Sequence, residues 1–416
     1  MEKEKPSPLR LVALTWNMSG RDNARSLAEW RKDDILHDKW ANLVLLMTSG
    51  YGMNADVIVV ALQEVYMAGS NVFGEYFGSL VQSNWMISAN QLGHRVSNTS
   101  TYMGMVSSSA ASFDQQLHVF WNRTRWPDLD IDKEAEVCFG TALPFLPASC
   151  LKASLGVRMW VRGKEKSTAP VFVVASHLPM VDTGIRGDAA RTAAWQLTRD
   201  EVLRKQLYPD RFFEMSRGIR DPRGPEETDA VYNDRVLASQ EQNMPHTTVW
   251  LGDLNFRTDQ EHGDRLTYLR QEEGHEMQAL LRAYEPSILS APFSFARGWR
   301  ECGQTQPPSP FESWRPRYTP TCKMRTLEDF MMMRQDRPED RKERAKALIK
   351  ARLNGDRLAY AQIHEREPSW CDRIFYRSVT HDQRHATLWC DVRKAAGGML
   401  LSDHDGVVAQ LNLNEY

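Results

Sequence analysis

Side chains of the types that catalyse hydrolysis lie beside short apolar runs at six separate places along the 416-residue sequence, and almost all of them come just after a run. They are Asn17, Glu64, His177, Asp253 with Asn255, Asp372, and Asp403 with His404. In a layered α/β fold the ends of several strands meet at one edge, where a rigid scaffold positions polar residues. Burying several carboxylates without partners would cost too much free energy. The pattern therefore predicts one polar site assembled from six segments.

Asn17 and Glu64 offer hard oxygen ligands, and no cysteine lies near them in the sequence. Such donors suit Mg²⁺, which binds few protein groups and keeps water or substrate phosphate as its other ligands. We therefore predict that these two residues bind Mg²⁺. An acidic residue at a strand end also commonly serves in a turn or a cap, which is the alternative for Glu64.

Asp253 and Asn255 lie two residues apart in the segment WLGDLN, with Leu254 between them. On an extended backbone both polar side chains then face one side while Leu254 faces the core. This arrangement suits a carboxylate that deprotonates water and an amide that orients it. The alternative is an Asx-turn that leaves the strand.

His404 needs a partner from another segment, because its side chain and that of Asp403 diverge on an extended backbone. We predict Asp372 as that partner. An aspartate bonded to one ring nitrogen leaves the other nitrogen free to donate to a phosphoryl oxygen. His177, which ends the run VFVVASH, is a second candidate for phosphate contact, with a buried structural histidine as the alternative.

Nine short runs rich in β-branched and apolar residues predict the strands that position these side chains. They cover residues 11–16, 57–62, 117–121, 155–161, 171–178, 247–254, 374–377, 386–392 and 407–413. Two stretches with helical spacing, Leu27 to Met47 and Asp188 to Leu207, lie between some of these runs. Because strands outnumber helices and often follow one another, we expect an α/β sandwich of two packed β-sheets flanked by helices.

The overall composition excludes several classes of protein. Hydrophobic residues make up 42% and charged residues 25%, as in ordinary globular domains. The net charge of -2 disfavours a general nucleic-acid-coating protein. No apolar run approaches the roughly 20 residues of a membrane-spanning helix, and we expect no secretory signal. The six cysteines lack metal-binding spacing, so we expect no zinc site or disulfide framework, and a reduced, cytoplasmic setting.

A charged excursion occupies residues 324–367. Within it, residues 337–360 carry eight Lys or Arg and four Asp or Glu, a net charge of +4. Good helix formers follow Pro338, and Gly355 lies near the end, which predicts a helix between them. Such a helix could contact an anionic membrane surface. A solvated surface helix is the alternative.

Several of these segments occur in the order found in one family. The motifs TWN, LQE, SHL, WLGDLNFR at 250–257, PSWCDRI at 368–374 and SDH at 402–404 resemble those of the inositol polyphosphate 5-phosphatases. The resemblance implies a four-layer, DNase I-like fold of the endonuclease/exonuclease/phosphatase superfamily. It also implies an N-terminal tail at 1–9 and a catalytic domain at 10–416, with the charged helical insertion at about 324–367.

The resemblance implies roles for the matching residues. The implied Mg²⁺ ligands are Asn17, Glu64 and Asp403. The implied catalytic residues are Asp253, which activates water, Asn255, which orients it, Asp372 and its partner His404, and His177. The implied substrate-binding residues are Lys323, Arg366, Arg373 and Lys152.

Three departures from the family pattern concern the substrate side of the site. Cys322 stands where the family has a tyrosine before Lys323, and Glu365 replaces a basic residue before Arg366. The family sequence HRPV reads HDGV at 404–407. The metal and water-activating positions are intact, so the resemblance implies that hydrolysis is preserved.

Three functions are compatible with these observations. The first is a Mg²⁺-dependent phosphatase that removes the 5-phosphate of phosphoinositides, such as phosphatidylinositol 4,5-bisphosphate, or of soluble inositol polyphosphates. Its partners would be the inositol phosphate or phosphoinositide substrate and, peripherally, an anionic membrane, with no nucleic acid. The second is a nuclease or sphingomyelinase-like phosphodiesterase of the same superfamily, because fold alone does not decide the substrate. The third is a catalytically weak phosphoinositide-binding module.

Overall fold

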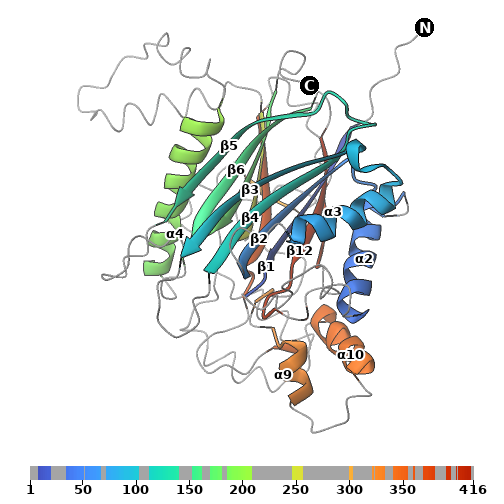
Figure 1. Ribbon diagram of the computed structural model, residues 1–416. Coiled ribbons are helices and arrows are strands. Elements are labelled where there is room, and N and C mark those ends of the chain that lie inside the picture. The colour runs from blue at the N-terminus through green and yellow to red at the C-terminus, as the bar shows by residue number, and fades with distance from the viewer. Residues whose placement is uncertain are drawn as a thin grey trace, which may run out of the picture.

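The structure of the chain is a computed structural model. The described residues are 8–19, 34–50, 52–66, 72–102, 112–139, 152–161, 169–179, 185–208, 246–255, 299–302, 321–322, 324–332, 341–354, 359–360, 369–379, 390–394, 400 and 402–413. Their strands form two packed β-sheets with helices on the outer faces (Figure 1), which confirms the predicted four-layer architecture.

The first sheet has six strands in the order β11-β12-β1-β2-β4-β3. Their bounds are β1 Leu9–Asn17, β2 Val57–Tyr66, β3 Leu92–Tyr102, β4 Ser112–Asn122, β11 Cys390–Lys394 and β12 Val407–Leu413. β1 and β2 are parallel, and the other described pairs of this sheet are antiparallel. The chain therefore places the ends of β1 and β2 side by side at one edge.

The second sheet also has six strands, in the order β5-β6-β7-β8-β10-β9. Their bounds are β5 Asp130–Cys138, β6 Ala153–Trp160, β7 Val171–His177, β8 His246–Asp253, β9 Arg300–Glu301 and β10 Asp372–Val379. Here β7 and β8 are parallel, whereas β8 and β10 are antiparallel. The end of β7, the end of β8 and the start of β10 consequently meet.

Side-chain alternation along the strands builds the layers. Val171, Val173 and Ala175 of β7 face the first sheet, in a core shared with β1, β2, β4, β8 and β12. Phe172 and Val174 face the opposite way, towards the helical segment that covers the second sheet. Because successive side chains of a strand point to opposite faces, both faces of these central strands are apolar.

Helices cover the outer face of each sheet. On the first sheet lie α2 (Asp34–Thr48) and α3 (Val72–Trp85), and on the second lie α4 (Ile185–Leu197) and the π-helical η2 (Thr198–Leu207). Trp40, Leu43, Val44 and Met47 of α2 are buried at the spacing of one helix face. A short 3₁₀ turn, η1, spans Ala89–Gln91. No helix in the described part of the chain is long and apolar enough to cross a membrane.

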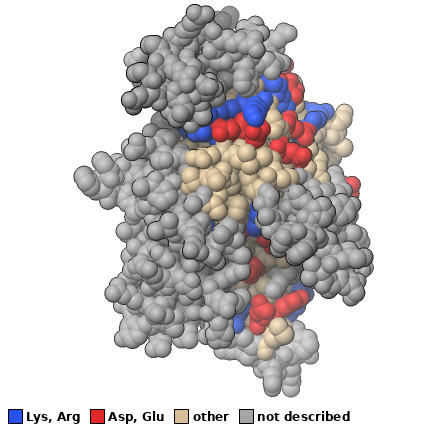
Figure 2. All heavy atoms as spheres, turned by 90° about the vertical axis from the view of Figure 1, so that its left-hand side faces the viewer, with Lys and Arg blue, Asp and Glu red and all other residues tan. Residues whose placement is uncertain are grey.

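The exposed side of η2 carries both charge signs. Figure 2 shows this face, on which Lys and Arg side chains are interspersed with Asp and Glu. Lys205, which is 61% exposed, pairs with Glu201 at 2.6 Å, while the buried Arg204 reaches Asp200 at 2.9 Å. Neighbouring opposite charges largely compensate each other, in keeping with the near-zero net charge of the chain.

The insertion predicted at 324–367 contributes two helices. They are α9 (Leu327–Met332) and α10 (Arg341–Asn354), which lie together at the lower end of the sandwich in Figure 1. The predicted helix is confirmed over Arg341–Asn354, while Pro338 and Gly355 lie outside the described residues. Ala345, Leu348 and Ala351 of α10 are buried, so the helix is packed against the domain along one side.

The cysteines differ from the sequence expectation at one position. Cys138, at the end of β5, is disulfide-bonded, so the expectation that the cysteines form no disulfide is wrong there. Cys302, Cys322 and Cys371 are buried and form no disulfide.

Candidate active site

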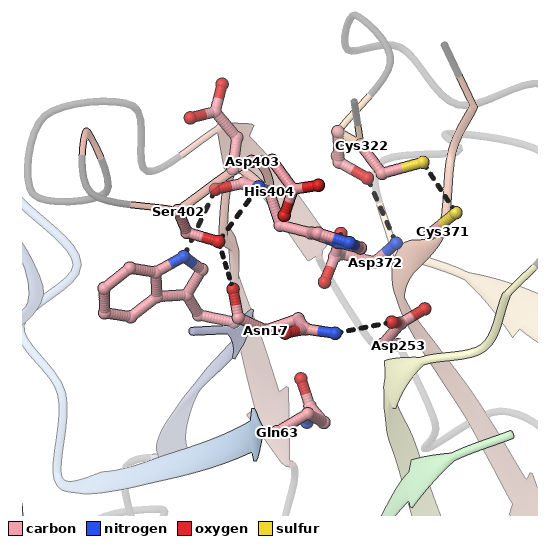
Figure 3. Close-up of polar contacts among 12 residues, drawn as sticks. Asn17, Gln63, Asp253, Cys322, Cys371, Asp372, Ser402, Asp403 and His404 are labelled. Carbon is pink, nitrogen blue, oxygen red and sulfur yellow. Dashed lines mark hydrogen bonds and ion pairs between the residues drawn. The ribbon is translucent and has the colours of Figure 1, made fainter. Parts of the chain in front are cut away.

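The register of three strands brings the catalytic candidates of the second sheet into one row. His177 lies opposite Asp253 across the parallel β7–β8 pair, and Asp253 lies opposite Asp372 across the antiparallel β8–β10 pair. Asn17, at the end of β1, closes the gap between the two sheets because its Nδ2 donates to Asp253 Oδ2 at 2.8 Å. Figure 3 shows this contact and the arrangement of the surrounding residues. The Asp253 carboxylate of the second sheet is thus bonded to a residue of the first sheet.

The backbone is specialised on either side of Asp253. Gly252 has a φ of 148°, and a Cβ there would lie 1.8 Å from the Ser176 carbonyl oxygen, so only glycine fits. Asn255 has a φ of 52°. Its backbone N–H donates to Asp253 Oδ1 at 3.0 Å, and its Nδ2 donates to the Leu178 carbonyl at 2.8 Å. Asn255 therefore fixes the carboxylate through its backbone, as in an Asx-turn.

Glu64 reaches the site from a local irregularity in β2. The pairing of β2 with β4 shifts between Leu62 and Val65, and Glu64 has a φ of 53°. A non-glycine residue in this region is uncommon and costs free energy, and such conformations cluster at functional sites. The side chain stays 38% exposed, in contrast to its buried neighbours. The bulge thereby turns a carboxylate out of the sheet towards the site.

His177, Lys152 and Glu64 form a charged cluster beside Asp253. His177 Nε2 lies 3.5 Å from Glu64 Oε1 and 3.4 Å from Asp253 Oδ2. Lys152 Nζ lies 3.6 Å from Glu64 Oε1 and is in contact with His177 Nε2. The Glu64 and Asp253 carboxylates and the Lys152 ammonium group therefore all approach His177 Nε2.

The pKa values of this cluster reflect the competition between burial and the neighbouring charges. Burial and the Lys152 charge lower the pKa of His177, although Asp253 and Glu64 oppose them. Burial would raise the pKa of Glu64, but His177 and Lys152 outweigh it and lower this pKa. Likewise, burial would raise the pKa of Asp253, yet the neighbouring His177, His404 and Lys152 hold it well below its usual value. Asp253 is therefore a carboxylate at neutral pH.

Asp372 and His404 form a buried pair. Asp372 Oδ2 lies 2.8 Å from His404 Nδ1. Burial raises the pKa of Asp372 to about 7 against the opposing charge of His404. Burial would lower the pKa of His404, but the charge and hydrogen bond of Asp372 raise it to about 10. The pair thus holds a proton on His404 throughout the neutral range, as predicted for this partnership from the sequence.

A hydrogen-bond network centred on Ser402 joins His404 to β1. Ser402 Oγ donates to the Asn17 carbonyl at 2.6 Å and accepts from the His404 backbone N–H at 3.0 Å (Figure 3). Ser19 N–H donates to Asn17 Oδ1 at 2.8 Å, and the Ser19 hydroxyl bonds to Asp403. Asp403 is therefore linked to Asn17 through a single residue.

The substrate-binding candidates differ in their placement. Lys152 lies in the charged cluster described above. Arg373, in contrast, is fully buried with its guanidinium 5.3 Å from the centre of the Phe375 ring. Phe375 belongs to the outer face of the second sheet, opposite the face that Ile374 shares with the core between the sheets. The structure therefore does not bring Arg373 to the site. Lys323 and Arg366 lie outside the described residues.

Several site residues were not singled out from the sequence. Ser402 was visible only as part of SDH, and Ser19 and Thr321 had no signal of their own. Thr321 Oγ1 accepts from the Asp372 backbone N–H at 3.1 Å. Its neighbour Cys322 forms a β-bridge with His404, and the Cys322 and Cys371 sulfur atoms lie 2.8 Å apart (Figure 3). These contacts link segments far apart in sequence, which spacing alone does not reveal.

The donor chemistry of the site suits a hard cation. Glu64 and Asp253 approach the same atom, His177 Nε2, and the Asn17 amide contacts Asp253. These are oxygen donors, and Mg²⁺ is commonly held by only one or two carboxylates together with water and substrate. Among the described residues, no group of three His, Cys, Asp or Glu side chains is close enough to hold a metal. The arrangement fits a cation bound by few protein ligands.

Comparison with known proteins agrees with this architecture. The Endonuclease/Exonuclease/phosphatase family model matches residues 14–404, which include every candidate site residue. The chain belongs to this family. Family members are hydrolases that typically use a divalent metal, so the chain is a hydrolase of the Endonuclease/Exonuclease/phosphatase family. A comparison with curated proteins finds no match.

Solved structures similar to this Endonuclease/Exonuclease/phosphatase family member include several different proteins. One is the inositol polyphosphate 5-phosphatase domain of SPsynaptojanin in complex with inositol (1,4)-bisphosphate and calcium ion, at 15% identity and a TM-score of 0.42, covering 97% of this chain and 84% of that chain. Another is truncated Caenorhabditis elegans TDP2, at 11% identity and a TM-score of 0.40, covering 97% and 98% respectively. A third is the endonuclease/exonuclease/phosphatase from Beutenbergia cavernae, at 14% identity and a TM-score of 0.39, covering 98% and 72%.

Proposed function

We propose that the chain is a Mg²⁺-dependent phosphatase that hydrolyses the 5-phosphate of phosphoinositides or soluble inositol polyphosphates. The observation that carries this proposal concerns the motifs WLGDLNFR at 250–257 and PSWCDRI at 368–374. They resemble those of the inositol polyphosphate 5-phosphatases. Their described parts run as neighbouring antiparallel strands, with Asp253 opposite Asp372. This register supports a common role for the two motifs in one catalytic site.

Asp253 is ionised and held in a fixed orientation, which places it to act as the general base. Its pKa is held well below the usual value, so it is ionised, and it is nearly fully buried. Asn17 Nδ2 and the Asn255 backbone N–H hold its two oxygens, which orients the carboxylate. A water molecule held against Asp253 would lose its proton to the carboxylate and attack phosphorus, the bond between phosphorus and the inositol oxygen would break, and the departing oxygen would take a proton from solvent. Positioned proton transfer of this kind typically contributes about 10²–10⁴-fold to a rate.

His404 has the properties of a donor to the phosphoryl group. Asp372 binds its Nδ1 and keeps the ring protonated, which leaves Nε2–H available for a phosphoryl oxygen. A buried cation positioned in advance stabilises the negative charge that develops during phosphoryl transfer. Lys152, beside His177, would add a second positive charge at the same phosphate.

Glu64 and Asn17 would hold the Mg²⁺ ion, with Asp403 as a further ligand close to Asn17. The half-exposed carboxylate of Glu64 and the oxygen chemistry of this set support that assignment. Bound Mg²⁺ would supply Lewis-acid polarisation of the phosphoryl oxygens. Substrate phosphates beyond the one removed would be bound by Lys323 and Arg366, as the family resemblance implies.

A phosphate-release panel tests this proposal. Wild type and Asp253→Asn would be incubated with phosphoinositide vesicles, soluble inositol polyphosphates, single-stranded DNA and a sphingomyelin-like diester, with Mg²⁺ or with chelator. We expect Mg²⁺-dependent release of phosphate from inositol substrates by wild type alone. Hydrolysis confined to a nucleic acid or a choline diester would overturn the proposal in favour of a phosphodiesterase. Binding of the inositol lipid without turnover would indicate a binding module.

A further inference from the structure

Arg352 of α10 differs from the other basic residues of the charged insertion. Its side chain is fully buried, and its Nη1 lies 2.6 Å from Asp405 Oδ1, whose carboxylate is also fully buried. On the exposed side of the same helix, Lys346 is 68% exposed. Burying a guanidinium is costly unless it is paired and hydrogen-bonded. Arg352 therefore belongs to the interior of the domain and not to a solvated helix surface.

The guanidinium holds both ends of the segment that carries His404. Arg352 Nη2 donates to the Ser402 carbonyl at 2.9 Å, while Nη1 bonds to Asp405. The planar fork of arginine fixes two acceptors at once, which a lysine cannot do in the same way. His404 lies between these two anchored residues. Arg352 thus constrains the backbone from residue 402 to residue 405 from one side.

Neighbouring hydrogen bonds extend this anchoring across the insertion. Arg352 Nη2 also donates to the Arg325 carbonyl at 2.6 Å. The Met324 backbone N–H donates to the Asp403 carbonyl at 2.8 Å, and the Asp405 N–H donates to the Thr321 carbonyl at 2.7 Å. The insertion therefore contacts the catalytic segment directly through both backbone and side chain.

Asp405 is itself a departure from the family pattern, since HDGV stands where HRPV is usual. The arginine that would be expected at that position is replaced by an acid. The matching base comes from the charged insertion at 324–367. Asp405 and Arg352 thus compensate each other's charge in one buried ion pair.

We propose that Arg352, through Asp405 and the Ser402 carbonyl, is a positioning residue for His404. It touches no reacting atom. It fixes the backbone on both sides of His404 and thereby sets the direction of the imidazole towards the phosphoryl group. This rests on the proposed role of His404 in hydrolysis. A displacement of about 1 Å at a catalytic group can cost on the order of 10²-fold in rate.

The test compares Arg352→Met and Arg352→Lys with Lys350→Gln, an exposed site on the same helix. On a soluble substrate that wild type hydrolyses, we expect Arg352→Met to lower kcat by about 10–100-fold with KM changed less than about 3-fold. Arg352→Lys should recover only part of the loss, and Lys350→Gln should equal wild type. If Arg352→Met fails to fold, the double variant Arg352→Met/Asp405→Leu, which removes the whole buried pair, takes its place.

A double-mutant cycle separates positioning from general structural support. In a His404→Ala background, Arg352→Met should cost less than about 2-fold more in kcat, because its effect acts through the imidazole. A full additional loss in that background would overturn the proposal.

If none of the panel substrates is hydrolysed, a spectroscopic measurement can still test the proposal. Selective ¹⁵N-histidine labelling should show the His404 Nδ1–H proton that is bonded to Asp372. This signal should shift or broaden in folded Arg352→Met and stay unchanged in Lys350→Gln. An identical signal in Arg352→Met would also overturn the proposal, whatever the substrate.

Discussion

Replacing Asp372 with asparagine should make the activity of the enzyme strongly dependent on pH. In the wild type, the charge of Asp372 and its hydrogen bond 2.8 Å from His404 Nδ1 raise the pKa of His404 to about 10 despite its burial. An amide cannot provide that charge. Burial, which lowers the pKa of His404, is then opposed only by the more distant Asp253 and Asp403. We expect the pKa of His404 to fall to its ordinary value of about 6.5 or lower.

The size of the effect follows from the protonated fraction of His404. With a pKa of about 10, the ring is about 99% protonated at pH 8 and fully protonated at pH 6. With a pKa of about 6.5, it is about 3% protonated at pH 8 and about 75% at pH 6. The loss of kcat/KM in Asp372→Asn should therefore be about 25-fold greater at pH 8 than at pH 6. Asp253 does not titrate in this window, because its pKa is held well below its usual value. Asp372, whose pKa is raised to about 7, does titrate in it in the wild type, so the loss in the variant is taken relative to wild type at the same pH.

The assay is a pH series of kcat/KM for wild type, Asp372→Asn and Glu343→Gln, with thermal unfolding measured at each pH. Glu343→Gln makes the same kind of change at a carboxylate that is 74% exposed, so its profile should follow wild type. Partial recovery of Asp372→Asn on acidification is the expected result. An equal loss at pH 6 and pH 8 in a folded variant would refute the inferred protonation of His404.

Three further predictions concern the other parts of the site. Asp253→Asn should lower kcat by about 10² or more with the fold retained, measured by turnover and thermal unfolding, and unchanged turnover would contradict a general base. Glu64→Gln should raise the Mg²⁺ concentration for half activity, and an identical Mg²⁺ titration would contradict metal binding. Replacing Arg341, Lys342 and Lys346 with glutamine should reduce activity on anionic vesicles at low salt but not on a short-chain soluble substrate; equal vesicle activity would indicate a merely solvated helix face.

The strand arrangement was largely predictable because most central strands are buried on both faces. Runs such as 57–62 and 171–178 contain almost no polar residues, and each lies within a strand of the structure or overlaps one closely. β5 was missed, since it is an edge strand with mostly exposed or half-buried side chains. β3, which is also an edge strand, was missed for the same reason. Edge strands bury less apolar surface, so their sequences carry less periodic signal.

The polar residues of the candidate site at strand ends were predictable for a related reason. A polar residue that follows an apolar run must lie where the strand leaves the core, and parallel neighbours such as β7 and β8 end together. Arg373 shows the limit of this reasoning. It is next to Asp372 in sequence, but neighbouring residues of a strand face opposite sides, and it lies buried against Phe375. The motif PSWCDRI alone does not show which of its residues lie on the face of β10 that carries the site.

Counting charges in the insertion could not predict that Arg352 is buried. In the sequence it is one of eight basic residues in a +4 segment, and nothing local distinguishes it from Lys346. The distinction lies in Asp405, which is 53 positions further along the chain and faces it at 2.6 Å. A buried charge is tolerated only with a partner, and the identity of that partner is a property of the folded chain. The available signal was the sequence HDGV at 404–407. Its Asp405 is an acid beside His404, a candidate site residue, and once buried it needs a basic partner, which the basic segment at 337–360 could supply.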